Sequence, residues 1–352
     1  MEIVKGCVVN IDGVEWFPAQ NTNLLCQQIG KRIICRDILP YYDQEEFLYN
    51  AIHKYAEKIF LVPWRAKDIL VYDTKRSEKN FLSCEELSDW QDMDYKYSFS
   101  ITCDNFLYLF GRRIPGIVKI NMCTNKIELL NGLIDSRNTN LNELEPMCGL
   151  FFSYNYVREE SCVWIPLLGE KGIVQFNLLD DSLRLYDLPI GCSAICQSEE
   201  RGKFWLFSQK QKSIIKWSCS GKIEDKINNI DLRSECGETV LKNDSGRLKC
   251  ISNLESINVD LETRQCIKGK GEISKEVIQC AECSDDLLSR YFRAINKEEK
   301  CYLENTVRSF RLYMKYIVID KEQTYFKQSR INESVVQHVG SKIHLFTKAM
   351  SE

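Results

Sequence analysis

The chain repeats one pattern of apolar segments six times within its first 270 residues. Each copy has an apolar run that ends near Pro or a small residue, then a polar tip, then a second apolar run that ends near Asp or Asn; the sixth copy is weaker. Aligned on these landmarks, the copies are 45, 48, 55, 42 and 42 residues apart, at Pro18, Pro63, Gly111, Pro166, Ser208 and Cys250. Self-similarity at this period predicts an array of one supersecondary unit.

Each copy extends into four strand-like segments separated by turn residues. The second and third segments are only about five residues apart, which is hairpin spacing. A parallel sheet would instead need a crossover helix of a dozen or so residues between them. In the third, fourth and fifth copies the predicted strands are Tyr97–Thr102, Asn105–Phe110, Gly116–Met122 and Lys126–Asn131; Leu150–Val157, Cys162–Pro166, Gly172–Leu178 and Ser182–Leu188; and Cys192–Gln197, Lys203–Ser208, Ser213–Ser218 and Lys222–Ile227.

These repeats resemble the β-propeller superfamily, in a six-bladed architecture of the kelch, NHL and TolB-like kinds. The resemblance lies in blade layout. The sequence has no WD dipeptide closing a blade, no Gly-Gly doublet of the kelch type and no sialidase box. It implies a mainly β protein in which residues 1–271 form six blades of four strands, and it transfers no catalytic residue.

Residues 272–352 break the repeat and are expected to form a helix-rich segment packed on the propeller. Apolar residues recur there at helical spacing. The alternative is a degenerate seventh blade with Ser341–Thr347 as a strand. The three candidate helices carry Val277, Ala281, Leu288 and Ile295; Leu303, Val307, Phe310, Met314 and Ile317; and Val336, Val339, Ile343 and Phe346, with Arg308, Arg311 and Lys315 between the apolar positions of the second.

Composition excludes several partner classes. The formal net charge of −3 disfavours a broad nucleic-acid surface. No apolar run is long enough to span a membrane, and the N-terminus lacks the features of a secretory signal. The odd count of 17 cysteines and the absence of a disulfide-like spacing predict a reducing, cytoplasmic location. Several thiols lie in apolar runs and are expected to be core residues: Cys26, Cys35, Cys123, Cys162, Cys192 and Cys196.

The polar tips between the second and third strands are the most suggestive surface. In a propeller these tips gather at one end of the central channel, so residues far apart in sequence converge there. Arginine suits carboxylate or phosphate, and Trp64 offers a stacking surface. The alternative is that these turns are basic because they are solvated. The candidate binding residues are Trp64, Arg65, Lys67, Arg112, Arg113, Lys171, Lys210 and Lys212, opposed by Asp68 and Glu170, with amides at Gln20, Asn21 and Asn23 of the first tip.

Catalytic signals are weak. His53 is predicted on the innermost strand of blade 2, where a structural role is the simplest interpretation. Cys280 and Cys283 form a CxxC with only Cys301 and His338 as conceivable partners, short of a zinc pattern. The carboxylate pairs Asp180-Asp181, Glu199-Glu200 and Glu85-Glu86 fall in predicted turns, and the sequence has no Gly-rich phosphate loop. We therefore expect no metal and no cofactor.

The sequence thus predicts a non-enzymatic propeller that binds a protein partner or an anionic small molecule or carbohydrate at its basic tips. The alternative is a lyase or hydrolase at the channel mouth, acting on a carbohydrate or acidic substrate. In that reading Arg65, Arg112 or Arg113 would bind the substrate, and His53 or a tyrosine would act as the base. An enzyme should gather ionisable groups with shifted pKa values in the channel, whereas a scaffold should present a broad polar end.

Overall fold

A computed structural model describes most of the repeat region of the chain. The described residues are 3–20, 23–40, 48–83, 87, 94–114, 116–130, 152–153, 155–167, 171–233, 239–244, 246–252, 254–270, 277–278 and 287. The chain divides into two compact units, one made of residues 1–83 and 275–352 and the other of residues 84–274. We call them unit 1 and unit 2.

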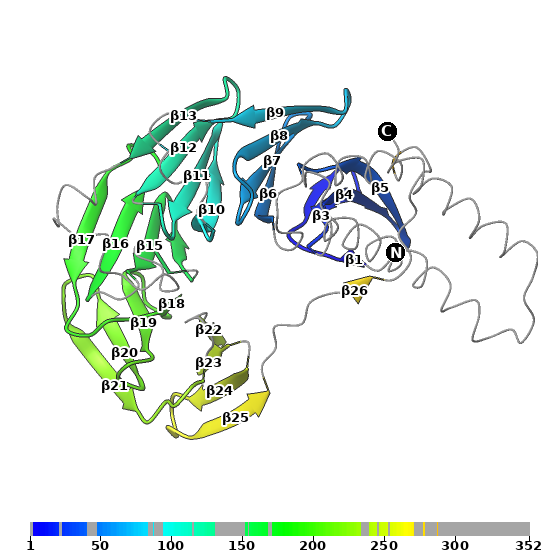
Figure 1. Cartoon of the computed structure of the whole chain (residues 1–352). Helices are drawn as coiled ribbons and strands as arrows, with labels where there is room; N and C mark the ends of the chain where they lie inside the picture. Colours follow the sequence, from blue (N-terminus) through cyan, green and yellow to red (C-terminus); the bar gives the residue numbers. More distant parts are fainter. Residues whose placement is uncertain are drawn as a thin grey trace, which may run out of the picture. The chain divides into compact units, whose positions relative to one another are not determined.

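The repeats fold as six four-stranded antiparallel sheets, and in each sheet the spatial order of the strands follows the sequence (Figure 1). This confirms the six-bladed β-propeller. Every blade, including the first and the last, is built from four consecutive strands of its own.

Unit 1 contains blades 1 and 2 and a separate two-stranded ladder of β1 with β26. The strands are β1 (Ile3–Val4), β2 (Val9–Ile11), β3 (Val14–Pro18), β4 (Leu24–Ile29), β5 (Arg32–Ile38), β6 (Tyr49–Tyr55), β7 (Lys58–Pro63), β8 (Ile69–Asp73), β9 (Glu78–Leu82) and β26 (Val277–Ile278).

Unit 2 contains blades 3 to 6, with first strands such as β10 and β22 on the inner side and fourth strands such as β13 and β21 on the outer side (Figure 1). The strands are β10 (Tyr97–Cys103), β11 (Phe106–Gly111), β12 (Ile117–Asn121), β13 (Lys126–Leu130), β14 (Val157–Glu159), β15 (Cys162–Pro166), β16 (Gly172–Asn177), β17 (Leu183–Asp187), β18 (Ala194–Gln197), β19 (Lys203–Ser208), β20 (Ser213–Ser218), β21 (Ile223–Asn228), β22 (Val240–Asp244), β23 (Arg247–Ile251), β24 (Glu255–Asp260) and β25 (Cys266–Lys270).

The Asp or Asn landmark at the end of the third strand has a local cause. Asp73 Oδ1 accepts the backbone N–H groups of Lys75 and Arg76, both at 2.9 Å. Asp260 makes the same pair of bonds to the residues two and three positions later. The side chain thus takes the place of a backbone acceptor and sets the turn into the fourth strand. These N–H groups stabilise the carboxylate and lower the pKa of both Asp73 and Asp260.

Within each unit, apolar side chains fill the space between neighbouring blades, on both faces of the second and third strands. Between blades 3 and 4, the ring of Phe110 contacts Phe152 and Phe176 edge to face, with centroids 5.5 and 5.7 Å apart. Between blades 4 and 5, Trp164 and Trp217 pack together. Continuous apolar runs are therefore expected in these strands, because both of their faces are buried.

Several polar contacts join blades 3 and 4 at the turn between the third and fourth strands of blade 4. The Tyr108 hydroxyl lies 3.0 Å from both the Leu178 carbonyl and the Asp181 carboxylate, and Lys119 forms an ion pair with the same carboxylate. Asp181 lies in a turn, as predicted, and its side chain is 27 % exposed. The turn residues Glu199 and Glu200 are exposed, and residues 85–86 lie outside the described part.

One strand prediction and one core prediction are wrong. The first strand of blade 4 was predicted over residues 150–157, but β14 begins at Val157, and Phe152 makes only an isolated bridge to Leu167. Cys123 was expected in the core but is exposed on the turn after β12. Cys162 is half-buried, whereas the remaining thiols of the predicted set are buried: Cys26, Cys35, Cys192 and Cys196.

The tail returns to the start of the chain. Val277, which was expected on a helix, forms β26 together with Ile278, and these two residues pair with Val4 and Ile3. A short strand fits these β-branched residues as well as a helix does. Beyond them the description covers only Leu287, which is helical and buried. The other predicted helical positions and the strand 341–347 lie outside the described residues.

Candidate functional site

The tip of blade 2, in unit 1, carries Trp64, Arg65 and Lys67. Three consecutive backbone N–H groups, of Trp64, Arg65 and Ala66, donate to the carbonyl of Leu48 at 2.8 to 3.2 Å. Leu48 directly precedes the first strand of the blade, so the tip is fixed to the start of its own sheet. Trp64 and Arg65 are half-buried and Lys67 is exposed.

The tip of blade 3, in unit 2, is fixed in the same way. The N–H groups of Arg112 and Arg113 donate to the Lys96 carbonyl at 2.8 and 3.3 Å. Gly111 begins this tip, and a Cβ there would lie 1.9 Å from the Ile114 carbonyl oxygen. The bend therefore requires glycine.

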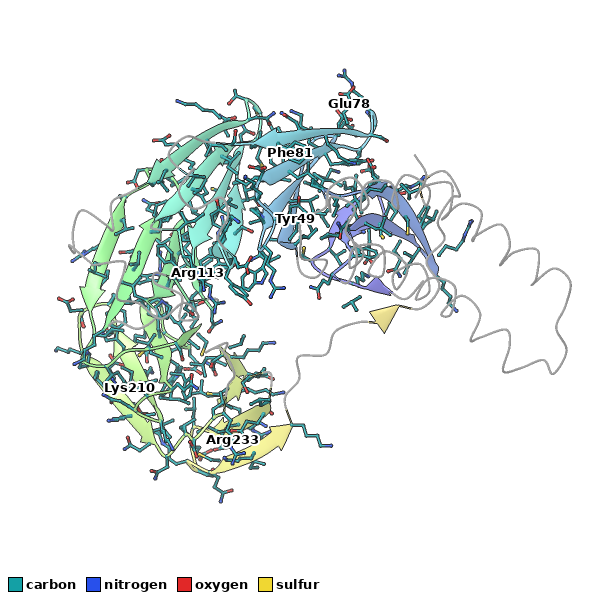
Figure 2. The ribbon with its side chains drawn as sticks, in the orientation of Figure 1. Tyr49, Glu78, Phe81, Arg113, Lys210 and Arg233 are labelled. Carbon is teal, nitrogen blue, oxygen red and sulfur yellow. The ribbon has the colours of Figure 1, made fainter. Side chains whose placement is uncertain are left out.

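The two arginines of this tip differ in burial. Its position in a polar turn suggested that Arg112 exposes its guanidinium group. Arg112 is only 4 % exposed, so it does not present a surface cation. Arg113 is half-buried and labelled in Figure 2. Both guanidinium groups lie over the ring of Tyr95, at 5.7 and 5.5 Å from its centroid, a distance that permits cation–π attraction.

Tyr95 is a site residue that sequence reasoning missed. It lies in the connection to β10 with a φ of 60°, which is uncommon for a bulky residue. The left-handed backbone places an aromatic ring beside two arginines. The available signal was the position of Tyr95 two residues before a first strand, since blade connections end where the tips lie.

The tips of blades 4 and 5, also in unit 2, present exposed lysines. Lys171 and Lys210 are exposed, and neither has a carboxylate partner in the described part of the chain. Lys210 is labelled in Figure 2. Lys212 instead forms an ion pair with Asp231 at 2.8 Å. We refer to Arg113, Lys171 and Lys210 as the tip cations.

Two of the three amides expected at the tip of blade 1, in unit 1, lie within the described residues. Asn23 is completely buried, and its backbone carbonyl accepts the N–H of Leu39 at 2.6 Å. The Gln20 side chain packs against Gly6. Asn21 and Glu170 lie outside the described residues.

The predicted site residues fall into two sets. Arg112, Lys212 and the tip cations belong to unit 2, and Trp64, Arg65 and Lys67 belong to unit 1. Within unit 2 the tips of three successive blades carry the cations, and the described residues of these tips include no carboxylate.

Other candidate groups do not form a reactive cluster within the described residues. His53 lies on β6 as predicted, where burial lowers its pKa to about 4. No group of three His, Cys, Asp or Glu with metal-binding geometry occurs in the described ranges; residues 280, 283, 301 and 338 of the conceivable zinc set lie outside them. Nor do these ranges contain a helix long and apolar enough to cross a bilayer.

Comparisons with known proteins concern the fold alone. No protein-family model matches the chain, and no curated protein matches it. A streptogramin B lyase is 11% identical over 77% of this chain and 84% of its own, with a TM-score of 0.48. The dihydro-heme d1 dehydrogenase NirN is 12% identical over 74% and 56%, with a TM-score of 0.46. The extracellular domain of the hybrid two-component system BT3049 from B. thetaiotaomicron is 12% identical over 78% and 35%, with a TM-score of 0.45. The chain therefore spans about a third of the BT3049 domain and little more than half of NirN.

Proposed function

We propose that the chain is a non-enzymatic binding propeller whose unit 2 captures an acidic segment of a partner protein. The tip cations Arg113, Lys171 and Lys210 would bind carboxylates, and Tyr95 would supply an apolar face beside Arg113. A role as a cytoplasmic scaffold agrees with this proposal.

The observation that carries the proposal is that the tips of three successive blades of unit 2 each carry a cation. Lys119, Lys203 and Lys216 are neutralised by carboxylates at 3.0 Å or less. The tip cations have no such partner among the described residues. Cations of one sign on the turns of successive blades attract an oppositely charged surface and speed its association.

The spacing of the cations favours an extended ligand. Each tip cation comes from a different blade, and each blade is a separate four-stranded sheet. A small anion can contact one tip, whereas an extended acidic segment can contact several. Small anions bound at a single tip are the competing outcome in the experiment below.

The test compares two triple variants with the same change in net charge. Arg113→Glu/Lys171→Glu/Lys210→Glu alters the tips. Lys126→Glu/Arg184→Glu/Lys226→Glu alters exposed positions on the fourth strands of the same three blades. The probe is a fluorescein-labelled oligoglutamate peptide, with binding followed by fluorescence anisotropy at low and at physiological salt.

We expect the tip variant to bind at least tenfold more weakly, which corresponds to about 1.4 kcal/mol, and the control variant to bind as the wild type does. Added salt should weaken wild-type binding. Equal losses in both variants would show that net charge alone drives binding, and an unchanged tip variant would overturn the proposal. Complete competition by inorganic phosphate at one tip would indicate a small-anion site.

A further inference from the structure

Two cysteines face each other across the third and fourth strands of blade 1. Cys26 on β4 and Cys35 on β5 are direct partners in the antiparallel register, and their sulfur atoms lie 4.0 Å apart. Opposite residues in such a ladder have Cα atoms about 4.5–5.5 Å apart. A disulfide requires about 4.4–6.8 Å. Rotation of the side chains can therefore bring the sulfur atoms to bonding distance while the separation of the two strands stays the same.

A bulge next to the pair gives the strand local freedom. Leu25 pairs with Asp37 and Cys26 pairs with Cys35, so Arg36 is an extra residue of β5 in this register. A bulge interrupts the ladder and bends the strand that carries it. The backbone beside Cys35 can thus adjust when the two sulfur atoms approach each other.

We propose that Cys26 and Cys35 form a peroxide-sensitive dithiol that closes reversibly to a disulfide within blade 1. The proposal is independent of the proposed function. Cys35 is 6 % exposed and Cys26 is fully buried, so a small oxidant reaches Cys35 first. Other buried thiols without an opposing thiol are inert to this reaction, because they have no second sulfur to attack.

The chemistry requires one molecule of hydrogen peroxide and two steps. The Cys35 sulfur attacks one peroxide oxygen, the O–O bond breaks, and Cys35 becomes a sulfenic acid with release of one water. The Cys26 sulfur then attacks the Cys35 sulfur, the S–O bond breaks, and a second water leaves with the Cys26 proton. Two thiols are oxidised to one disulfide, and a thiol reductant restores them.

The cross-link would stiffen the contact between blades 1 and 2 of unit 1. Asp37, two residues after Cys35, accepts a hydrogen bond from Lys79 of β9 at 2.9 Å. Tying β5 to β4 restricts the strand that carries Asp37. We therefore expect the oxidised chain to melt at a higher temperature than the reduced chain, because a disulfide limits the unfolded state.

The experiment exposes the folded, full-length chain to hydrogen peroxide, blocks the remaining thiols by alkylation and identifies linked peptides by mass spectrometry. We expect a Cys26–Cys35 peptide that disappears after reduction, and an oxidised chain whose melting temperature is raised by several degrees. Cys35→Ser should lose both the peptide and the shift, whereas Cys192→Ser, which removes a buried thiol elsewhere, should keep both.

Wild-type chain alone suffices to overturn the proposal, so a variant that fails to fold does not obscure the result. The folded chain is treated with peroxide until the exposed Cys219 and Cys266 are oxidised, and it is then unfolded and alkylated. If Cys26 and Cys35 still react with the alkylating reagent, the pair is not peroxide-sensitive. A linked peptide that forms only in urea would likewise contradict closure in the folded blade.

Discussion

The side-chain oxygen of Asn155 accepts a hydrogen bond from the backbone N–H of Leu241 at 3.2 Å, across 86 residues of sequence. The same Oδ1 atom accepts the N–H of Ile195 at 2.8 Å. Asn155 lies two residues before the first strand of blade 4, and the two donors lie on the first strands of blades 5 and 6. One amide oxygen therefore joins the segment that leads into blade 4 to the innermost strands of the next two blades in unit 2.

Asn155→Ala should destabilise the chain by about 2–4 kcal/mol, because two backbone N–H groups lose their acceptor. Urea unfolding followed by circular dichroism measures the change. Asn177→Ala is the matched control, since its Oδ1 accepts only the nearby N–H of Leu179 at an exposed turn. We expect that control to cost less than about 1 kcal/mol. Similar losses in the two variants would show that the contact across the blades adds nothing.

Tyr108→Phe should weaken the joint between blades 3 and 4 by about 1–2 kcal/mol at neutral pH, because the hydroxyl shared by Leu178 and Asp181 is lost. Burial, followed by the hydrogen bond to Asp181, raises the pKa of Tyr108. Unfolding frees this phenol to ionise above about pH 10, so its contribution to stability is lost as the pH rises. Denaturation at neutral and at alkaline pH should show the two chains converging. A constant difference between them would contradict the role of ionisation.

The repeat pattern predicted the strands of blades 3 and 5 to within two residues, because hydrophobic runs and turn residues act locally. The same reasoning failed at the start of blade 4. Phe152 belongs to an apolar run that resembles a strand, but Ser153 and Asn155 interrupt the ladder there by bonding to other blades. Ser153 Oγ donates to the Ser193 carbonyl at 2.7 Å. Contacts between distant repeats leave no periodic signal in the sequence.

The candidate site was only partly predictable for the same reason. Tip positions follow from the repeat, so the chain segments that carry Arg113, Lys171 and Lys210 could be located. Burial of Arg112 depends on how the tip packs against the preceding connection. The pairing of Lys212 with Asp231 and the left-handed backbone of Tyr95 also depend on that three-dimensional packing, and a single sequence does not encode it in its spacing.

Buried and exposed thiols should separate cleanly in a reactivity experiment. Burial raises the pKa of Cys192 and of Cys196 to about 12, and thiol reagents attack the thiolate. We expect Cys219 and Cys266, which are exposed, to react with iodoacetamide in the folded chain within the time that leaves Cys192 and Cys196 unlabelled. Peptide mass spectrometry identifies the labelled positions. If Cys192 and Cys196 were labelled in the folded chain as fast as in urea, their burial would be contradicted.

Gly111→Ala should disrupt the tip of blade 3 and cost more than about 2 kcal/mol, because the added Cβ meets backbone oxygen. Gly221→Ala is a matched control. Its φ is +88°, but nothing lies within 4 Å of the added Cβ, so only the backbone strain of about 1 kcal/mol applies. Thermal unfolding compares the two variants. An equal shift in both would show that the tip relaxes around the new methyl group.

His53 should make the chain less stable in mild acid. Its pKa is lowered by burial to about 4 in the folded chain, against about 6.5 when unfolded. Below pH 6.5 the unfolded state therefore binds a proton that the folded state does not, and stability falls as the pH drops from about 6.5 towards 4. His53→Gln removes the imidazole that binds this proton but keeps a polar side chain. Urea unfolding at several pH values should show the wild type losing more stability than the variant across this window, and the difference should level off below pH 4. Parallel losses in both chains would mean that His53 titrates alike in the folded and unfolded states.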